Sequence, residues 1–160
     1  MNAKFVLALA GVIFCFTHAD AKKAMKEVVW PAEEIQFKDM GAEKGMTTGG
    51  VSQAVLWGDP EKGAHASLVK FAPGTKHPLH SHSATVKVVV ISGTLLYAPE
   101  NGAEKKLGPG SYLMVPGNMK HTSGCEATEC LFFSEASGKW DRKTVETKSA
   151  ATHTTASETN

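Results

Sequence analysis

The sequence predicts an all-β fold, a sandwich or barrel of short strands in a single domain. From Val28 to Trp140, short apolar runs are separated by Gly, Pro and Asp, and no stretch keeps the helical period of about 3.6 residues. The separating segments, such as WGDPEKG, APENG and LGPG, consist of turn-forming residues. About 110 residues carry this pattern without internal duplication, which is enough for one β domain.

The expected strands follow the apolar runs along the chain. The runs are VVW at 28–30, VSQAVLWG at 51–58, ASLVKF at 66–71, TVKVVVIS at 85–92, GTLLYA at 93–98, SYLMVP at 111–116 and CLFFSE at 130–135. Alternate residues of a strand face the same side of a sheet. Val86, Val88 and Val90 therefore share the parity of His82, and we expect them to form an apolar wall inside the barrel.

Composition limits the partners. The 160 residues are 42% hydrophobic and 21% charged, with a formal net charge of +1. Such a balance suits a globular domain and gives no electrostatic reason for a polyanionic partner. A small-molecule ligand is expected, and nucleic acid is not.

The first 21 residues read as a cleaved Sec-type signal peptide. Lys4 precedes an apolar run from Phe5 to Phe16, and Ala19 and Ala21 form an A-x-A cleavage site. A run of about 12 apolar residues is shorter than the roughly 20 needed to cross a bilayer. We therefore expect a secreted or periplasmic protein with no membrane span in its mature form.

The segment after Trp140 marks the expected end of the folded domain. The segment after Trp140, DRKTVETKSAATHTTASETN, is rich in Thr, Ser, Ala and charge. Such a composition is typical of a disordered tail. The domain is expected to span residues 22–140 and the tail residues 141–160.

Three histidines suggest a metal site. His80 and His82 are two residues apart, so in a strand they face the same side and can converge on one ion. His121 opens the segment HTSGC, which can run as a strand beside the first. The alternative is a metal-free pocket in which the histidines are polar lining.

The motifs around these histidines resemble those of the cupin superfamily. GTKHPLHSHSATVKVVVISG matches the first cupin motif at Gly74, His80, His82 and Gly93. GSYLMVPGNMKHTSGC matches the second at Gly110, Pro116 and His121. With VVWPAEEIQF and QAVLWGDPEKG, the chain resembles a ChrR-like branch classed as a domain of unknown function. The resemblance implies a single RmlC-like jelly-roll barrel with the site inside it, and a homodimer, because cupin barrels commonly pair through their sheets.

The chain departs from the motifs at the fourth ligand. Val86 stands where cupins carry glutamate, and Asn118 and Cys125 replace the second motif's glycine and asparagine. Three neutral imidazoles would leave a divalent ion its full charge and open positions for an anionic ligand. Imidazole nitrogens suit several ions, with Fe(II) or Zn favoured here. Resemblance to three-histidine cupins implies an Fe(II) dioxygenase acting on a small chelating anion; the alternatives are a ligand-binding protein without catalysis and a zinc-stabilised structural or sensory domain.

Several further residues have two interpretations. Cleavage of the signal leaves Cys125 and Cys130, which are separated by the four residues EATE, as a candidate disulfide across strand ends. Cys125 would otherwise be a soft ligand or redox thiol near the pocket. Tyr112 and Met114 are expected to line the pocket with Val86 and Val88. Four residues are expected outside the metal group, with His77 in an exposed loop because it lies three residues from His80; the others are His65 within a strand, Glu135 at a strand end, and His153 in the tail.

Overall fold

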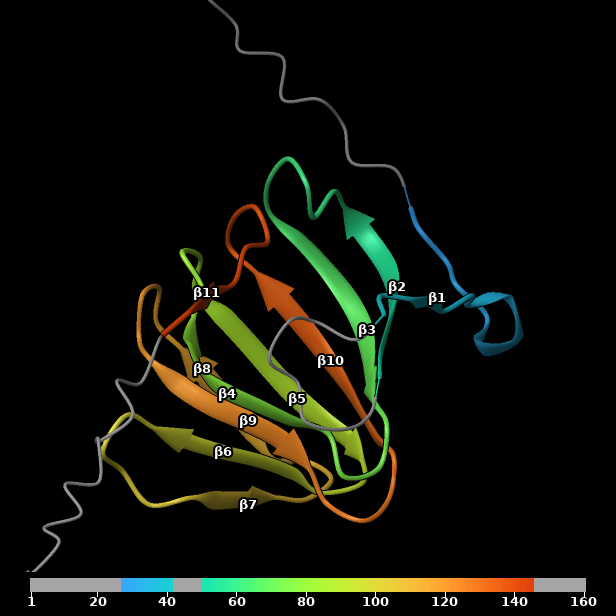
Figure 1. The fold of residues 1–160 in the computed structure, drawn as a ribbon. Coiled ribbons are helices and arrows are strands. Elements are labelled where there is room, and N and C mark those ends of the chain that lie inside the picture. Colours follow the sequence, from blue (N-terminus) through green and yellow to red (C-terminus); the bar gives the residue numbers. More distant parts are fainter. Residues whose placement is uncertain (1–26, 42–49, 146–160) are drawn as a thin grey trace, which may run out of the picture.

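The computed structural model describes residues 27–41 and 50–145 as two antiparallel sheets (Figure 1). The expected signal peptide lies outside the described residues. The larger sheet has the order β1-β2-β3-β10-β5-β8 and the smaller has the order β11-β4-β9-β6-β7. The all-β jelly-roll prediction is confirmed, because strands distant in sequence alternate between the two sheets.

The elements are short, as the turn-rich sequence predicted. Their bounds are η1 Ala32–Glu34, β1 Lys38–Asp39, β2 Val51–Gly58, β3 His65–Phe71, β4 Lys76–Ser81, β5 Val86–Ser92, β6 Leu95–Pro99, β7 Lys105–Leu107, β8 Tyr112–Val115, β9 His121–Cys125, β10 Cys130–Ala136 and β11 Lys143–Thr144. No helix in the described part of the chain is long and apolar enough to cross a membrane.

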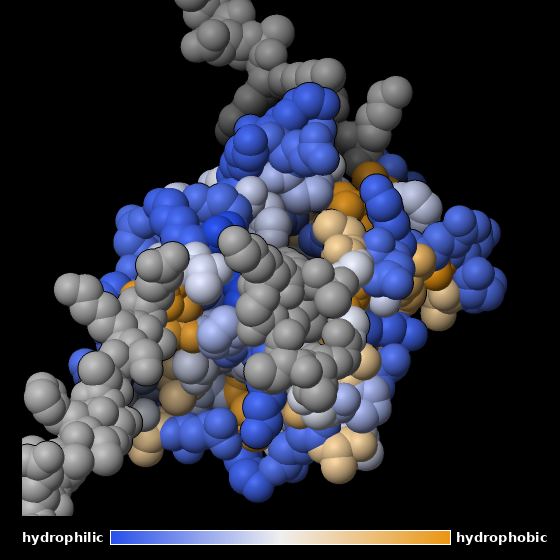
Figure 2. Space-filling view, viewed as in Figure 1, coloured by the Kyte–Doolittle hydropathy of each residue, from blue (hydrophilic) through white to orange (hydrophobic). Residues whose placement is uncertain are grey.

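The core lies between the sheets and follows the two-residue strand period. In β5 the buried residues are Val86, Val88 and Val90. In β10 alternate residues are likewise buried, among them Cys130, Phe132 and Ser134. The register places Val88 opposite Ser134 and Val90 opposite Phe132, so both strands turn the same parity inward. The face of the molecule viewed in Figure 2 has a mainly hydrophilic described surface, with separate apolar patches.

The prediction that Tyr112 and Met114 of β8 line the pocket is wrong. Tyr112 and Met114 are 60% and 51% exposed, whereas Leu113 and Val115 face the cavity. The register explains the difference, because it sets Leu113 opposite Val88 and directly opposed side chains share a face. Every residue from Tyr112 to Val115 is apolar, so the sequence carried no alternation from which to choose the inward parity.

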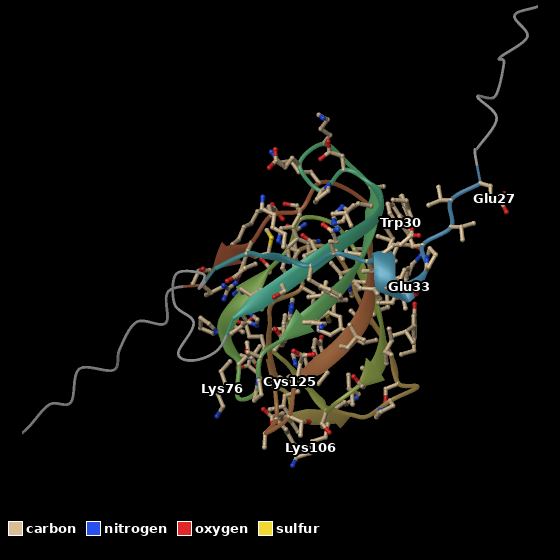
Figure 3. All side chains as sticks on the ribbon, turned by 90° about the vertical axis from the view of Figure 1, so that its right-hand side faces the viewer. Glu27, Trp30, Glu33, Lys76, Lys106 and Cys125 are labelled. Atoms are coloured by element: carbon tan, nitrogen blue, oxygen red, sulfur yellow. A yellow bond between two sulfur atoms is a disulfide. The ribbon has the colours of Figure 1, made fainter. Side chains whose placement is uncertain are left out.

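A disulfide closes one end of the barrel. Cys125 and Cys130 are bonded, with their Cα atoms 5.9 Å apart. They do not face each other across a hairpin of one sheet: Cys125 ends β9 in the smaller sheet and Cys130 begins β10 in the larger. In Figure 3, Cys125 lies at the same end of the molecule as Lys76 and Lys106, whose side chains point outward. The bond joins the two layers there and uses the thiol that would otherwise be a soft ligand.

The chain is ordered beyond Trp140, where a disordered tail was expected to begin. We call residues 140–145 the strap. Its strand β11 pairs with β4. The main-chain NH groups of Trp140 and Val145 donate to the carbonyl oxygens of Pro60 and Leu79. These backbone hydrogen bonds order a segment whose polar composition suggested disorder. The predicted start of the tail at residue 141 is therefore wrong, because residues 141–145 belong to the folded domain.

Candidate metal centre

Three histidines converge inside the barrel. One ring nitrogen from each of His80, His82 and His121 lies within 4.8 Å of the others, and all three side chains are buried. His80 is the penultimate residue of β4, His82 directly follows the strand, and His121 begins β9. The antiparallel pairing of β4 with β9 sets His80 opposite His121, so the fold itself brings the two motifs together.

Main-chain oxygens fix the orientation of each ring. Nδ1 of His80 donates to the carbonyl oxygen of Pro78 at 2.8 Å, and Nδ1 of His121 donates to that of Met119 at 3.0 Å. Nδ1 of His82 donates to the carbonyl oxygen of Asp141 at 2.6 Å. A carbonyl can only accept, so each Nδ1 carries the proton and each Nε2 keeps its lone pair. Such outer hydrogen bonds are typical of metal-binding histidines.

Burial keeps the rings of His80 and His121 neutral. Loss of solvation, followed by the charge of His121, lowers the pKa of His80 to about 3 despite the opposing hydrogen bond to Pro78. The pKa of His121 is also lowered, first by burial. Metal binding requires the unprotonated imidazole. The donor set is therefore ready for an ion at neutral pH, and its chemistry fits a divalent transition metal.

The turn before His121 tolerates its departure from the cupin motif. Asn118, in place of the second glycine, has a φ of 63°, a left-handed conformation that asparagine adopts more readily than most residues. Its NH donates to the carbonyl oxygen of His82 at 2.6 Å. Gly117 must remain small, because a Cβ there would lie 2.4 Å from the carbonyl oxygen of Ser83. The substitution thus preserves the contact between the two histidine segments.

His77 was predicted to lie in an exposed loop, and this prediction is wrong. Its side chain is buried and lines the cavity, 3.2 Å from the Ser123 hydroxyl and in contact with Phe71. The register between β4 and β9 shifts between His77 and His80, an interval that contains Pro78 and has one residue more on β4 than on β9. The extra residue reverses the parity, so two histidines three positions apart both face inward.

A cavity of about 110 Å³ adjoins the three histidines. Val86 and Val88 contribute to its apolar wall, as expected, and Val86 occupies the place of the motif glutamate. Strand parity identified these two valines correctly. The other apolar or aromatic residues that face it are Met40, Val51, Val69, Phe71, Leu95, Leu96, Tyr97, Leu113, Val115, Phe132 and Trp140.

Polar residues that sequence reasoning left outside the site also reach the cavity. His65 lines it and donates from Nδ1 to the carbonyl oxygen of Gly63 at 2.9 Å. Its Nε2 therefore carries a lone pair and can accept a hydrogen bond. Arg142 lines it from the strap. Trp140 lies against His82, with ring centroids 4.3 Å apart. Arg142 and Trp140 stand at or beyond the expected domain boundary, and Glu135 pairs with Lys87 instead of entering the site.

The buried histidine cluster inside a two-sheet jelly roll defines a cupin. The chain belongs to the family of the ChrR cupin-like domain, which matches residues 26–138. None of the curated proteins compared with the chain matches it.

Solved structures show the same fold at low sequence identity. The polyketide cyclase RemF from Streptomyces resistomycificus is 18% identical with a TM-score of 0.62, over 79% of this chain and 89% of that one. KdgF from Halomonas sp. is 20% identical with a TM-score of 0.55, over 71% and 94%. The DMSP lyase DddQ from Ruegeria pomeroyi is 17% identical with a TM-score of 0.56, over 71% and 62%. These similarities establish the architecture.

Proposed function

We propose that this protein is an exported three-histidine metalloenzyme that binds a small, chelating organic anion inside the barrel, with Fe(II)-dependent dioxygenation as its reaction. The observation that carries the proposal is the geometry of His80, His82 and His121: one ring nitrogen of each converges with the others, and every Nδ1 is held by a carbonyl oxygen. An ion bound there would supply Lewis acidity and, as iron, the capacity to react with oxygen.

The missing carboxylate supports an anionic substrate. Val86 leaves the donor set neutral, and no Asp or Glu is among the described residues that line the cavity. A substrate anion would supply the negative charge that a glutamate supplies in other cupins. The apolar wall excludes water from the rest of the substrate, and His65 offers an Nε2 acceptor to a substrate hydroxyl.

Export is supported by the disulfide. Cys125 and Cys130 form a bond that persists in oxidising compartments and is rare in the reducing cytosol. We therefore propose that the first 21 residues direct the chain to the periplasm or the exterior. Edman sequencing or intact mass of the protein recovered from the periplasm would test this, with a mature chain beginning at residue 22 as the expected result.

Oxygen uptake tests the reaction. The mature chain is loaded anaerobically with Fe(II) and exposed to oxygen with a panel of diketones, thiols and hydroxy or oxo acids. We expect uptake with at least one compound, none with the zinc-loaded protein, and none with the His80→Ala/His82→Ala/His121→Ala variant. Iron-loaded protein that consumes no oxygen with any compound would refute the dioxygenase.

A protein that binds a ligand without turning it over is the second candidate. The absence of an acidic side chain among the described cavity residues favours it, because a carboxylate general base is not at hand. Two structural neighbours are a cyclase and a lyase, which suggests non-oxidative chemistry as another outcome. Ligand recovered unchanged after long incubation with metal-loaded protein would support binding alone, whereas a product formed without oxygen would support lyase-like or cyclase-like chemistry.

A further inference from the structure

Among the residues that the structure describes, one permanent charge faces the cavity. Its other described polar lining consists of histidines, Gln53, Tyr97, Ser123 and Ser134, and burial lowers the pKa of two of these histidines, His80 and His121. Arg142 carries a guanidinium that stays protonated at any physiological pH. The cavity therefore has a positive potential that no described acidic lining residue offsets, and it favours an anion before any metal is bound.

Arg142 is distinctive in the sequence as well. It is the only arginine among 160 residues, although the chain contains 17 Lys and Arg in total. Its Nε and Nη2 atoms are shielded from solvent, and its charge contributes to the lowered pKa of His80 and of His121. The planar guanidinium thus lies inside the barrel, close to the histidine group, and not on the surface with the lysines.

The strap holds Arg142 in this place. On one side, the Asp141 carboxylate accepts hydrogen bonds from the Ser83 NH at 2.7 Å and from its hydroxyl at 2.6 Å. On the other, β11 pairs Lys143 with Ser81 and Thr144 with His80. Anchoring at both neighbours limits the freedom of the side chain between them, which lowers the entropy cost of binding a ligand.

We propose that Arg142 determines the ligand class, by pairing with the carboxylate of a short-chain 2-hydroxy or 2-oxo acid whose second oxygen faces the three histidines. The guanidinium fork matches a carboxylate through two parallel hydrogen bonds. A cavity of about 110 Å³ has room for roughly seven to eleven water-sized atoms, and its apolar wall suits a short hydrocarbon chain. The second-oxygen contact rests on the proposed metal centre; the pairing with Arg142 does not.

Chemical labelling tests the pairing without a variant. Phenylglyoxal modifies arginine, so mass spectrometry of the full-length mature protein reports on Arg142 alone. Glycolate, lactate and pyruvate are compared with their neutral amides at equal concentrations. We expect at least one acid to slow labelling five-fold or more while its amide does not. Equal labelling rates with all acids and amides would overturn the inference.

Variants separate the arginine from the metal. The proteins compared are wild type, Arg142→Met, Arg142→Lys and, as the matched control on the same strap, Lys143→Met, each checked for folding by thermal melting. Cobalt content is measured by elemental analysis, and acid binding by calorimetry and by the visible spectrum of bound cobalt. We expect equal cobalt content, wild-type acid affinity in Lys143→Met, and affinity at least ten-fold weaker in Arg142→Met and Arg142→Lys.

The outcomes distinguish this inference from the proposed function. Unchanged acid affinity in both Arg142 variants overturns the inference and leaves the metal centre intact. Absence of cobalt from the wild type refutes the metal centre, while protection of Arg142 from phenylglyoxal by the acids would still support the pairing. If Arg142→Met does not fold, Arg142→Lys and the labelling result decide.

Discussion

The main-chain oxygen of Asp141 accepts a 2.6 Å hydrogen bond from Nδ1 of His82. A residue near the end of the described chain thereby sets the tautomer of a histidine 59 positions earlier. The same residue's carboxylate binds both the NH and the hydroxyl of Ser83. Asp141 is thus part of the candidate metal centre, and its loss is expected to weaken metal binding without touching a ligand.

Asp141→Ala tests the role of the strap. The variant loses both hydrogen bonds to Ser83, so the Asp141 carbonyl is held less firmly against His82. Because loss of such outer contacts typically costs 10- to 100-fold in metal affinity, we expect zinc affinity to fall about 10-fold, measured by competition with a chromophoric chelator. Lys143→Met, which leaves the Ser83 contacts in place, is the control; equal affinities in the two variants would show that the strap does not orient His82.

Val86→Glu tests the effect of the absent carboxylate. Val86 is buried and lines the cavity at the position of the cupin glutamate. A carboxylate there would partly neutralise a bound divalent ion, so we expect EDTA to remove zinc at least 10-fold more slowly than from wild type. The same charge should weaken binding of anionic ligands. Val88→Glu, one inward position away, is the control, and faster or unchanged zinc loss from Val86→Glu would contradict the assignment.

The disulfide is expected to stabilise the fold without supporting the metal. Cys125 and His121 are four residues apart on β9, a separation of about 13 Å in an extended strand. Closing so short a loop contributes about 2 kcal/mol in the chain-entropy account. Cys125→Ala/Cys130→Ala should therefore melt several degrees lower by calorimetry and retain the wild-type zinc content. A loss of zinc from the folded variant would mean that the bond also shapes the site.

Acid should destabilise the metal-free protein through His80. In the unfolded chain a histidine takes up its proton near pH 6.5, whereas the pKa of His80 in the fold is about 3. Between these values the unfolded state binds more protons, so stability rises with pH and falls on acidification. His80 alone would contribute up to about 1.4 kcal/mol per pH unit there. Urea unfolding at pH 7.5, 5.5 and 4.5 should show a shallower dependence in His80→Asn; equal slopes would show that His80 does not stay neutral.

Strand period and motif spacing predicted much of this molecule. Alternation in TVKVVVIS identified Val86 and Val88 as cavity lining, and the spacing around His80, His82 and His121 identified the histidine group. Both patterns are local in the sequence. The pairing of β4 with β9 and of β5 with β10 then places these residues together inside the barrel.

The missed residues depend on interactions that local patterns do not contain. The extra residue of β4 between His77 and His80 reversed the parity of His77, and a proline between histidines was its only sequence signal. The inward parity of β8 came from its register with β5. Arg142 lies in a polar segment that looks disordered until β11 pairs with β4; its being the sole arginine was the available clue.

We expect His80, His82 and His121 to hold one divalent metal ion. Elemental analysis of the mature protein, purified without chelators and compared with the His80→Ala/His82→Ala/His121→Ala variant and with His77→Ala, tests this directly. We predict close to one ion per chain in the wild type and in His77→Ala, and below a tenth of that in the folded triple variant. Equal metal content in the wild type and the triple variant, or none in the wild type after reconstitution with Fe(II) and Zn, would contradict it.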